Sequence, residues 1–311
     1  MTLTNDNNNK PFDWIQILNN NVKNIDKQVT NSGKPYPSVF IVGAPRSGTT
    51  LLSQLFASCT EIGYVSNIMA LFWDAPILGA HVSEHFQDRP EFTGRSVYGK
   101  TSSPLEPHEF GMFWRTRLKY SGMDQQLYCN VELLRKLGNT LDEISKIFKK
   151  ITVYKVFQLT WHMHTYQTLK PETKWIWIER DLIENASSIL KLRETRNRNI
   201  EQWVSSRPHG VEPFLGNPFK EVLAQVILTN KWLAEKKSQM PAESVYHTHL
   251  SNLQRDPEAL FSDICQFVGL KLNDIQLRQS LKHIETKTKN ILYQTELTKI
   301  KDEMIDILDY V

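Results

Sequence analysis

Apolar residues fall into two kinds of pattern along the chain. Short apolar runs predict buried strands at 38–42, 62–65, 151–157, 174–179 and 244–248. Longer segments with helical spacing predict helices at 12–29, 49–58, 107–118, 131–149, 161–169, 182–193, 218–237 and 257–268, with weaker helices after them. Strands that alternate with helices predict an α/β fold whose central sheet is mostly parallel and covered on both faces.

Two segments lack a sustained pattern. Residues 66–119 are rich in Trp, His, Pro and Gly, and we expect mainly substrate-facing loops and short helices there. Residues 193–217 carry many Arg and Asn, and we expect a long mobile excursion. The Asn-rich residues 1–10 have little to bury and are expected to be disordered. Because no repeat or linker divides the remainder, residues 11–311 are expected to form a single domain.

Composition excludes several classes of protein. The chain has 311 residues and a net charge of only +3, without a long basic run, so nucleic acid is not an expected partner. Its three cysteines lie far apart and predict reduced thiols rather than disulfides or a zinc site. No signal peptide and no apolar run of about 20 residues is visible, so we expect a cytoplasmic protein that does not enter a membrane.

The segment after the first strand is a candidate anion-binding loop. Gly43-Ala44-Pro45-Arg46-Ser47-Gly48-Thr49-Thr50 stands between an apolar strand and an apolar helix. Glycines there let successive backbone N–H groups and a helix N-terminus point at one anion, and the hydroxyls of Ser47, Thr49 and Thr50 add donors. Thr49 stands where a triphosphate-binding loop has lysine, and Arg46 is the only cation within the loop. This loop therefore suits a small doubly anionic group better than a triphosphate with Mg²⁺.

A second candidate anion site follows the strand at 174–179. Arg180 ends this strand and Ser188 comes eight residues later, two helical turns along the next helix. A guanidinium at the carboxyl end of a strand offers a fork of donors to a phosphate, and a serine hydroxyl adds one more.

GAPRSGTTLL together with Arg180 and Ser188 resembles the two anion motifs of sulfotransferases that use 3′-phosphoadenosine 5′-phosphosulfate (PAPS). The arginine in the loop is similar to the bacterial and tyrosylprotein branches, and Leu182 stands where the family has proline. The resemblance implies a P-loop-like three-layer fold, PAPS as cosubstrate, adenosine 3′,5′-bisphosphate as product and no metal. We also see no cluster of ligands with metal-binding spacing.

The resemblance also implies roles for individual residues. Arg46 would stabilise charge on the bridging oxygen of the phosphosulfate, and Arg180 and Ser188 would hold the 3′-phosphate. The 5′-phosphate would be held by Ser47, Gly48, Thr49 and Thr50. A softer match over residues 244–270 places Tyr246 near the cofactor.

The general base of the family is missing from its usual places. Ser66 and Asn67 occupy the region of the glutamate of the tyrosylprotein branch, and Phe157 stands two places after the strand-end Lys155, where the cytosolic branch has histidine. Candidates from segments expected near the acceptor are Asp74, His81, Glu84, His85, His108, Glu109 and His162. We favour Asp74, which follows Phe72-Trp73 close to the family's base position, and place His108 second.

The acceptor is expected to be a small molecule. Aromatic side chains interleaved with carboxylates in residues 72–114 suit a polar or cationic acceptor, such as a guanidinium-bearing natural product. A protein-tyrosine sulfotransferase, a P-loop kinase or nucleotide hydrolase, and a non-catalytic nucleotide-binding protein are the alternatives. The kinase is disfavoured because it would not need the Arg180–Ser188 pair.

Overall fold

Five parallel strands form the central sheet of the computed structural model, which describes residues 13–29, 32–86, 96, 101–120, 122–125, 128, 130–281 and 292–309. The strands are β1 (Ser38–Val42), β2 (Ile62–Tyr64), β3 (Ile151–Lys155), β4 (Lys174–Glu179) and β5 (Val245–His249), in the spatial order β2-β3-β1-β4-β5. The predicted tail at residues 1–10 lies outside the described residues.

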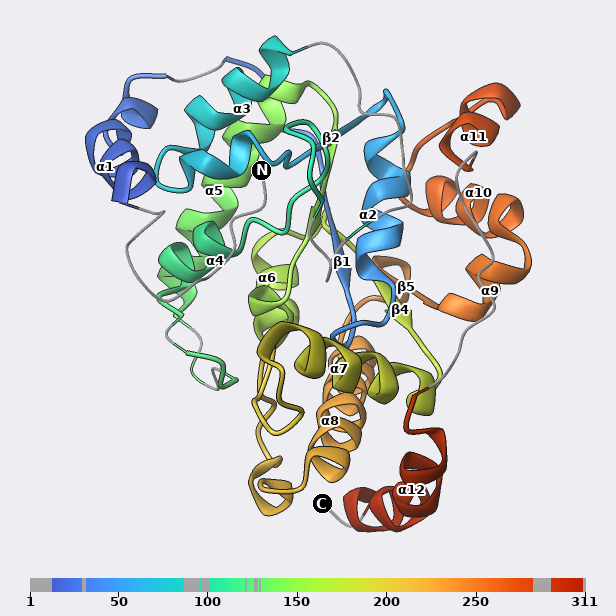
Figure 1. Ribbon diagram of the computed structural model, residues 1–311. Helices are drawn as coiled ribbons and strands as arrows, with labels where there is room; N and C mark the ends of the chain where they lie inside the picture. Colours follow the sequence, from blue (N-terminus) through green and yellow to red (C-terminus); the bar gives the residue numbers. More distant parts are fainter. Residues whose placement is uncertain are drawn as a thin grey trace.

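Helices cover both faces of this sheet (Figure 1). One face carries α2 (Thr49–Ala57), α9 (Leu250–Arg255), α10 (Pro257–Phe267) and α11 (Asp274–Leu281). The other face carries α4 (Gly111–Leu118), α5 (Val131–Phe148) and α6 (Met163–Leu169), with α1 (Asp13–Val22) and α3 (Pro76–His85) outside them. The predicted three-layer α/β architecture is therefore confirmed.

A third group of helices packs together at the lower end of the molecule in Figure 1. It consists of α7 (Leu182–Asn197), α8 (Pro218–Ser238) and α12 (Gln294–Asp309), which share one hydrophobic cluster. Short 3₁₀ helices complete the structure at η1 (Ile25–Lys27), η2 (Met69–Phe72), η3 (Gln158–His162), η4 (Glu212–Phe214) and η5 (Ala242–Ser244). None of the helices within the described residues is long and apolar enough to span a membrane.

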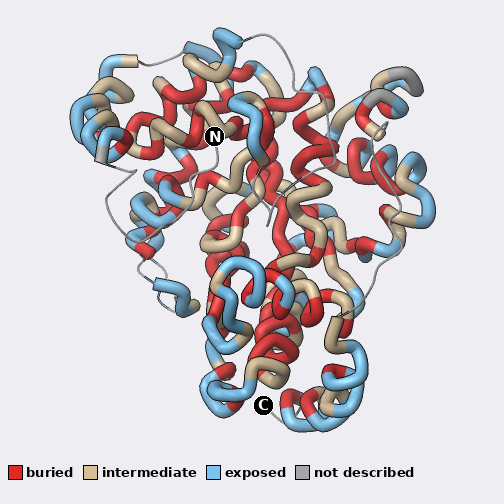
Figure 2. The backbone as a smooth tube through the Cα atoms, in the orientation of Figure 1, coloured by how far each residue is buried: buried red, intermediate tan, exposed pale blue. Residues whose placement is uncertain are grey.

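The central strand β1 is buried along its whole length (Figure 2). On one face of the sheet, Phe40 lies with its ring centroid 4.7 Å from that of Trp175 and 5.6 Å from that of Tyr154. Val39 and Ile41 pack into the cluster on the other face. A parallel strand between two layers of helices must be apolar on both sides, which explains the uninterrupted apolar run in the sequence.

The predicted excursion at residues 193–217 is wrong. Helix α7 continues to Asn197, and the segment beyond it returns to the protein interior with four buried hydrophobic side chains, Trp203, Val204, Val211 and Phe214. Arg193 is fully buried, pairs with Glu221 of α8 at 2.5 Å and lies 4.8 Å from the centroid of the Trp203 ring. The polar composition misled the prediction because the arginine contributes to packing rather than to a solvated surface.

The segment before α5 is more regular than the sequence pattern indicates. Helix α3 runs over ten residues, and its N-terminus is capped by Asp26, whose carboxylate accepts the N–H groups of Ile77 and Leu78 at 3.1 and 3.0 Å. Helix α4 begins only at Gly111, because Phe110 has a positive φ of 56° that no α-helix accommodates.

Candidate active site

The predicted anion loop lies where the strand order of the sheet changes direction. After β1 the chain builds β2 and β3 on one side of it, and β4 and β5 on the other. Ligands of open parallel sheets bind at such switch points, outside the carboxyl ends of the strands. Gly48, the N-cap of α2, has a φ of 113° and provides no side-chain cap. The first N–H groups of α2 are therefore available to an anion.

Close packing explains the glycines of this loop. A Cβ at Gly43 would clash with the carbonyl oxygen of Ile178 and stand 2.5 Å from Ser47 Oγ, and a Cβ at Gly48 would lie 2.8 Å from Leu250 Cδ1. Ser47, within the loop, is fully buried, and its Oγ has no hydrogen-bond partner within the described parts of the chain. The loop is thus pressed against the ends of β4 and α9.

The two predicted anion motifs contact each other directly. Arg46 has a φ of 69°, and its Nε donates to Ser188 Oγ at 3.2 Å. In return, Arg180 donates from a terminal guanidinium nitrogen to the carbonyl oxygen of Arg46 at 3.3 Å. Asn185 Nδ2 also donates to the carbonyl oxygen of Pro45 at 2.5 Å. Residues separated by more than 130 positions are therefore joined in one site.

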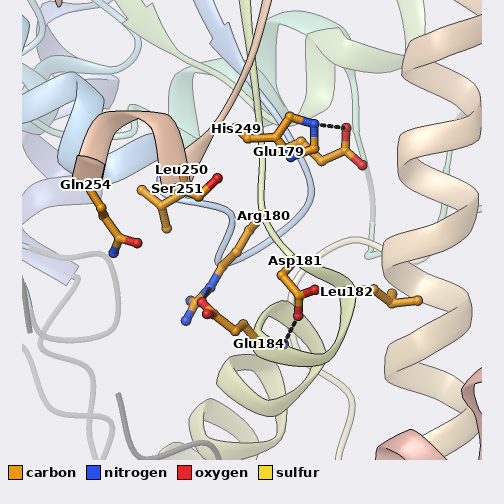
Figure 3. A pocket seen from close by; sticks show the side chains of 9 residues that line it. All are labelled: Glu179, Arg180, Asp181, Leu182, Glu184, His249, Leu250, Ser251 and Gln254. Carbon is orange, nitrogen blue, oxygen red and sulfur yellow. Dashed lines mark hydrogen bonds and ion pairs between the residues drawn. The ribbon is translucent and has the colours of Figure 1, made fainter. Parts of the chain in front are cut away.

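Arg180 borders a pocket of about 410 Å³ (Figure 3). Its side chain is 14% exposed and its Nε donates to Glu184 Oε2 at 3.1 Å. Figure 3 shows Arg180 and Glu184 pointing toward one another, with Ser251 and Gln254 of α9 also lining the pocket. Asp181 starts α7 by accepting the N–H of Glu184 at 3.0 Å, which fixes where Arg180 leaves the strand.

Lys155 is a second cation at the loop that the sequence prediction did not include among its site residues. It ends β3, opposite Ile41 of β1, and its Nζ donates to Thr50 Oγ1 at 2.9 Å. The same Nζ lies 3.4 Å from Glu109 Oε2, and the two side chains are 12% and 43% exposed. The available signal was a lysine at the end of a strand that neighbours β1 in a parallel sheet.

The family model described as "Sulfotransferase family" matches residues 37–274, which include the loop, β3 and the Arg180–Ser188 segment. The chain belongs to the sulfotransferase family. Solved structures share its fold: sulfotransferase STF9 from Mycobacterium avium is 12% identical with a TM-score of 0.58, and the match covers 96% of this chain and 81% of that one. Sulfotransferase STF1 from Mycobacterium tuberculosis H37Rv is 14% identical with a TM-score of 0.54, covering 93% and 80%. Comparison with curated protein sequences gives no match.

The candidate bases of this sulfotransferase-family protein make different contacts in the structure. The backbone of Asp74 is held by α1 and α4, since its N–H donates to Asn19 Oδ1 at 2.9 Å and its carbonyl accepts from Arg117 at 3.1 Å. His108 Nδ1 accepts the N–H of Phe110 at 2.8 Å, so a neutral ring carries its proton on Nε2. Of the candidates, Glu109 contacts Lys155 and is thereby linked to the loop.

Tyr246 lies inside β5 rather than at its carboxyl end. Its ring centroid is 5.4 Å from that of Phe267 in α10, and burial raises the pKa of its phenol. Its role as a cofactor ligand stays a prediction.

Three side chains of this sulfotransferase-family protein could hold a metal ion, although the sequence predicts no metal. They are Glu179, His247 and His249, at the carboxyl ends of β4 and β5. The spacing of these residues along the sequence does not reveal the group, because the glutamate and the two histidines come from different strands.

Proposed function

We propose that this protein transfers the sulfuryl group of PAPS to a hydroxyl or amine of a small-molecule acceptor. The observation that carries the proposal is the pair of contacts from Arg46 to Ser188 and from Arg180 to Arg46. They bring the predicted anion loop next to Arg180 and Ser188, which supports binding of one ligand with two anionic groups. PAPS carries a phosphosulfate and a separate 3′-phosphate on one nucleoside, so it needs two such sites together.

The residues present fit a phosphosulfate. The first turn of α2 contains no acidic residue, and no side chain caps its N–H groups. Ser47 Oγ is buried without a hydrogen-bond partner among the residues described, while Thr49 and Thr50 bring further hydroxyls to the helix start. Such a cradle of backbone N–H groups and hydroxyls binds one anion well.

Charge neutralisation is the main task of the residues around the loop. PAPS supplies an activated sulfuryl group whose leaving oxygen gains negative charge during transfer. Arg46 and Lys155 provide two cations there, and Lys155 is held in place by Thr50 and Glu109. By analogy with phosphoryl transfer, positioning and electrostatic stabilisation provide most of the rate enhancement.

The acceptor must also lose a proton. The contacts of the described residues favour Glu109 as the base, because its carboxyl group lies 3.4 Å from Lys155, next to the loop, and is 43% exposed. Asp74 and His108 stay alternative predictions, and Glu109→Gln, Asp74→Asn and His108→Gln variants compare the three directly. The proposal expects Glu109→Gln to lower single-turnover transfer far more than the other two.

The exposure of the aromatic side chains bears on the proposed acceptor class. Trp73, Phe110, Phe113 and Trp114 are buried in the core and are not available to an acceptor, whereas Phe86 is 49% exposed. Glu109 is a partly exposed carboxyl group beside the loop, which suits a cationic or polar acceptor. We propose a small polar or cationic natural product as the acceptor class.

Two measurements test the function. Calorimetry should show tighter binding of adenosine 3′,5′-bisphosphate than of ATP with Mg²⁺; the reverse preference would identify a kinase or hydrolase.

Transfer of labelled sulfate from PAPS should then be followed to a panel of small alcohols and amines, with tyrosine peptides as the comparison. The Arg46→Ala variant should lose transfer. Undiminished transfer in that variant would refute the role of Arg46, and sulfation of the peptides alone would refute the small-molecule acceptor.

A further inference from the structure

The carboxyl ends of β4 and β5 bring one carboxylate and two imidazoles together. In the register of the two strands, Glu179 lies opposite His249 and Trp177 lies opposite His247. Side chains two positions apart on a strand project from the same face, so both histidines lie on the same face as the glutamate. His247 Nε2 is 2.9 Å from Glu179 Oε2, and His249 Nε2 is 3.7 Å from the same oxygen. The three ligand atoms all lie within 4.8 Å of one another.

We propose that Glu179, His247 and His249 bind one divalent transition-metal ion of the Zn²⁺ class. In a tetrahedral site with metal–ligand bonds of about 2.0–2.1 Å, the ligand atoms stand roughly 3.3 Å apart. The observed separations of 2.9 and 3.7 Å fall on either side of that value. Two imidazoles and one carboxylate select Zn²⁺, Co²⁺ or Ni²⁺ over Mg²⁺ and Ca²⁺, which prefer oxygen ligands.

The surroundings hold these ligands in place. Asn230 of α8 donates from Nδ2 to Glu179 Oε1 at 3.1 Å, which leaves Oε2 directed at the histidines. The ring of His247 stacks on Trp177 with centroids 3.8 Å apart and an interplanar angle of 15°. Groups that orient the ligands in this way are a regular component of metal sites. The cluster is thus supported on two sides before any ion binds.

The site opens toward the pocket that contains Arg180. Figure 3 shows His249 and Glu179 directed at one another at the border of this pocket, and His249 is 49% exposed. Three protein ligands leave a further coordination position for water or an anion. An ion here would also join the edge strand β5 to β4, so we expect it to stabilise the folded state by mass action.

The test uses the untagged full chain after treatment with a chelator. Calorimetric titration with Zn²⁺ should give one equivalent, and titration with Co²⁺ should produce the visible absorption bands of a tetrahedral site. His249→Ala and Glu179→Gln should each weaken Zn²⁺ binding at least tenfold and abolish the rise in thermal midpoint that Zn²⁺ causes. His164→Ala removes an exposed histidine of α6 and should bind Zn²⁺ like the wild type.

The proposal is overturned if Zn²⁺ binds the His249→Ala variant as tightly as the wild type, or if Co²⁺ gives no tetrahedral bands. Either result would leave the cluster as a hydrogen-bonded Glu179–His247 pair. Because His249 is half-exposed, its replacement is expected to leave folding intact, which circular dichroism checks. Failure to bind Zn²⁺ would not contradict the proposed sulfuryl transfer, because that function is tested separately by binding of the bisphosphate and by transfer from PAPS.

Discussion

Replacing Lys155 by methionine separates a role in sulfuryl transfer from a role in stability. The change removes the ammonium group that lies 2.9 Å from Thr50 Oγ1 and 3.4 Å from Glu109 Oε2. Methionine keeps most of the apolar stem, so the packing around the side chain is largely retained. What the variant loses is a cation beside the loop.

The two roles predict different magnitudes. The partner Glu109 is 43% exposed and stays solvated after the change, so we expect the free energy of unfolding to fall by no more than about 1 kcal/mol. Removal of one donor from a site where charge develops typically costs a factor of about 10²–10³ in rate, or roughly 2.7–4 kcal/mol. Single-turnover transfer should therefore fall by about two to three orders of magnitude in a protein of nearly normal stability.

The assay measures single-turnover transfer from PAPS and urea unfolding on the same preparations. Lys170→Met is the matched control, because Lys170 is also a partly buried lysine (19% exposed) and pairs with Asp142, between α6 and α5. It should unfold like the Lys155 variant and transfer sulfate like the wild type. A normal single-turnover rate in Lys155→Met would refute the reasoning, because the cation would then have no part in the transition state.

The remaining predictions concern the second anion site, the loop and pH. Arg180→Ala should reduce the preference for adenosine 3′,5′-bisphosphate over AMP at least tenfold by calorimetry, because a charged hydrogen bond contributes about 1.5–3 kcal/mol; an unchanged preference would place the 3′-phosphate elsewhere. Gly48→Ala should abolish bisphosphate binding and lower the unfolding midpoint, since it adds a Cβ 2.8 Å from Leu250 Cδ1 at a φ of 113°; normal binding would show that the loop can shift. Burial lowers the pKa of His162 from its usual value of about 6.5, so the unfolded chain binds the proton more readily than the folded one. The free energy of unfolding should therefore fall as pH drops below about 6.5, by at most about 1.4 kcal/mol per pH unit. His162→Gln should flatten that part of the urea-unfolding profile, whereas the exposed His164→Gln should not; equal slopes in all three proteins would contradict this.

The sequence predicts those parts of the fold that depend on local pattern. Strand β1 is visible because a parallel strand covered on both faces is apolar throughout, and the loop after it is visible because glycines mark close backbone approaches. The link between Arg46 and Arg180 could be inferred from strand ends that meet at one edge of the sheet. The family itself is predicted from the resemblance of GAPRSGTTLL, Arg180 and Ser188 to sulfotransferase motifs, and the family model confirms it.

Other features depend on contacts between strands and could not be predicted from local pattern. Lys155 reaches Thr50 only because β3 is paired with β1, and the cluster of Glu179 with His247 forms only because β4 is paired with β5. Arg193 shows the opposite difficulty, since a fully buried arginine looks like a surface residue in sequence. Strand register and buried ion pairs depend on which segments meet in the folded protein, and a single sequence does not reveal those contacts.

The hydrogen bond from Arg46 to Ser188 has a consequence for how a nucleotide is recognised. Ser188 Oγ accepts from Arg46 Nε at 3.2 Å and keeps its own O–H to donate to a phosphate, so one hydrogen bond connects the groups predicted to hold the two ends of the same molecule. Recognition at the two ends is then cooperative within a single ligand. Ala substitutions at both positions should be non-additive, with a coupling energy of about 0.5–3 kcal/mol in a double-mutant cycle of bisphosphate affinity. A nucleotide with only one of the two anionic groups would lack this coupling.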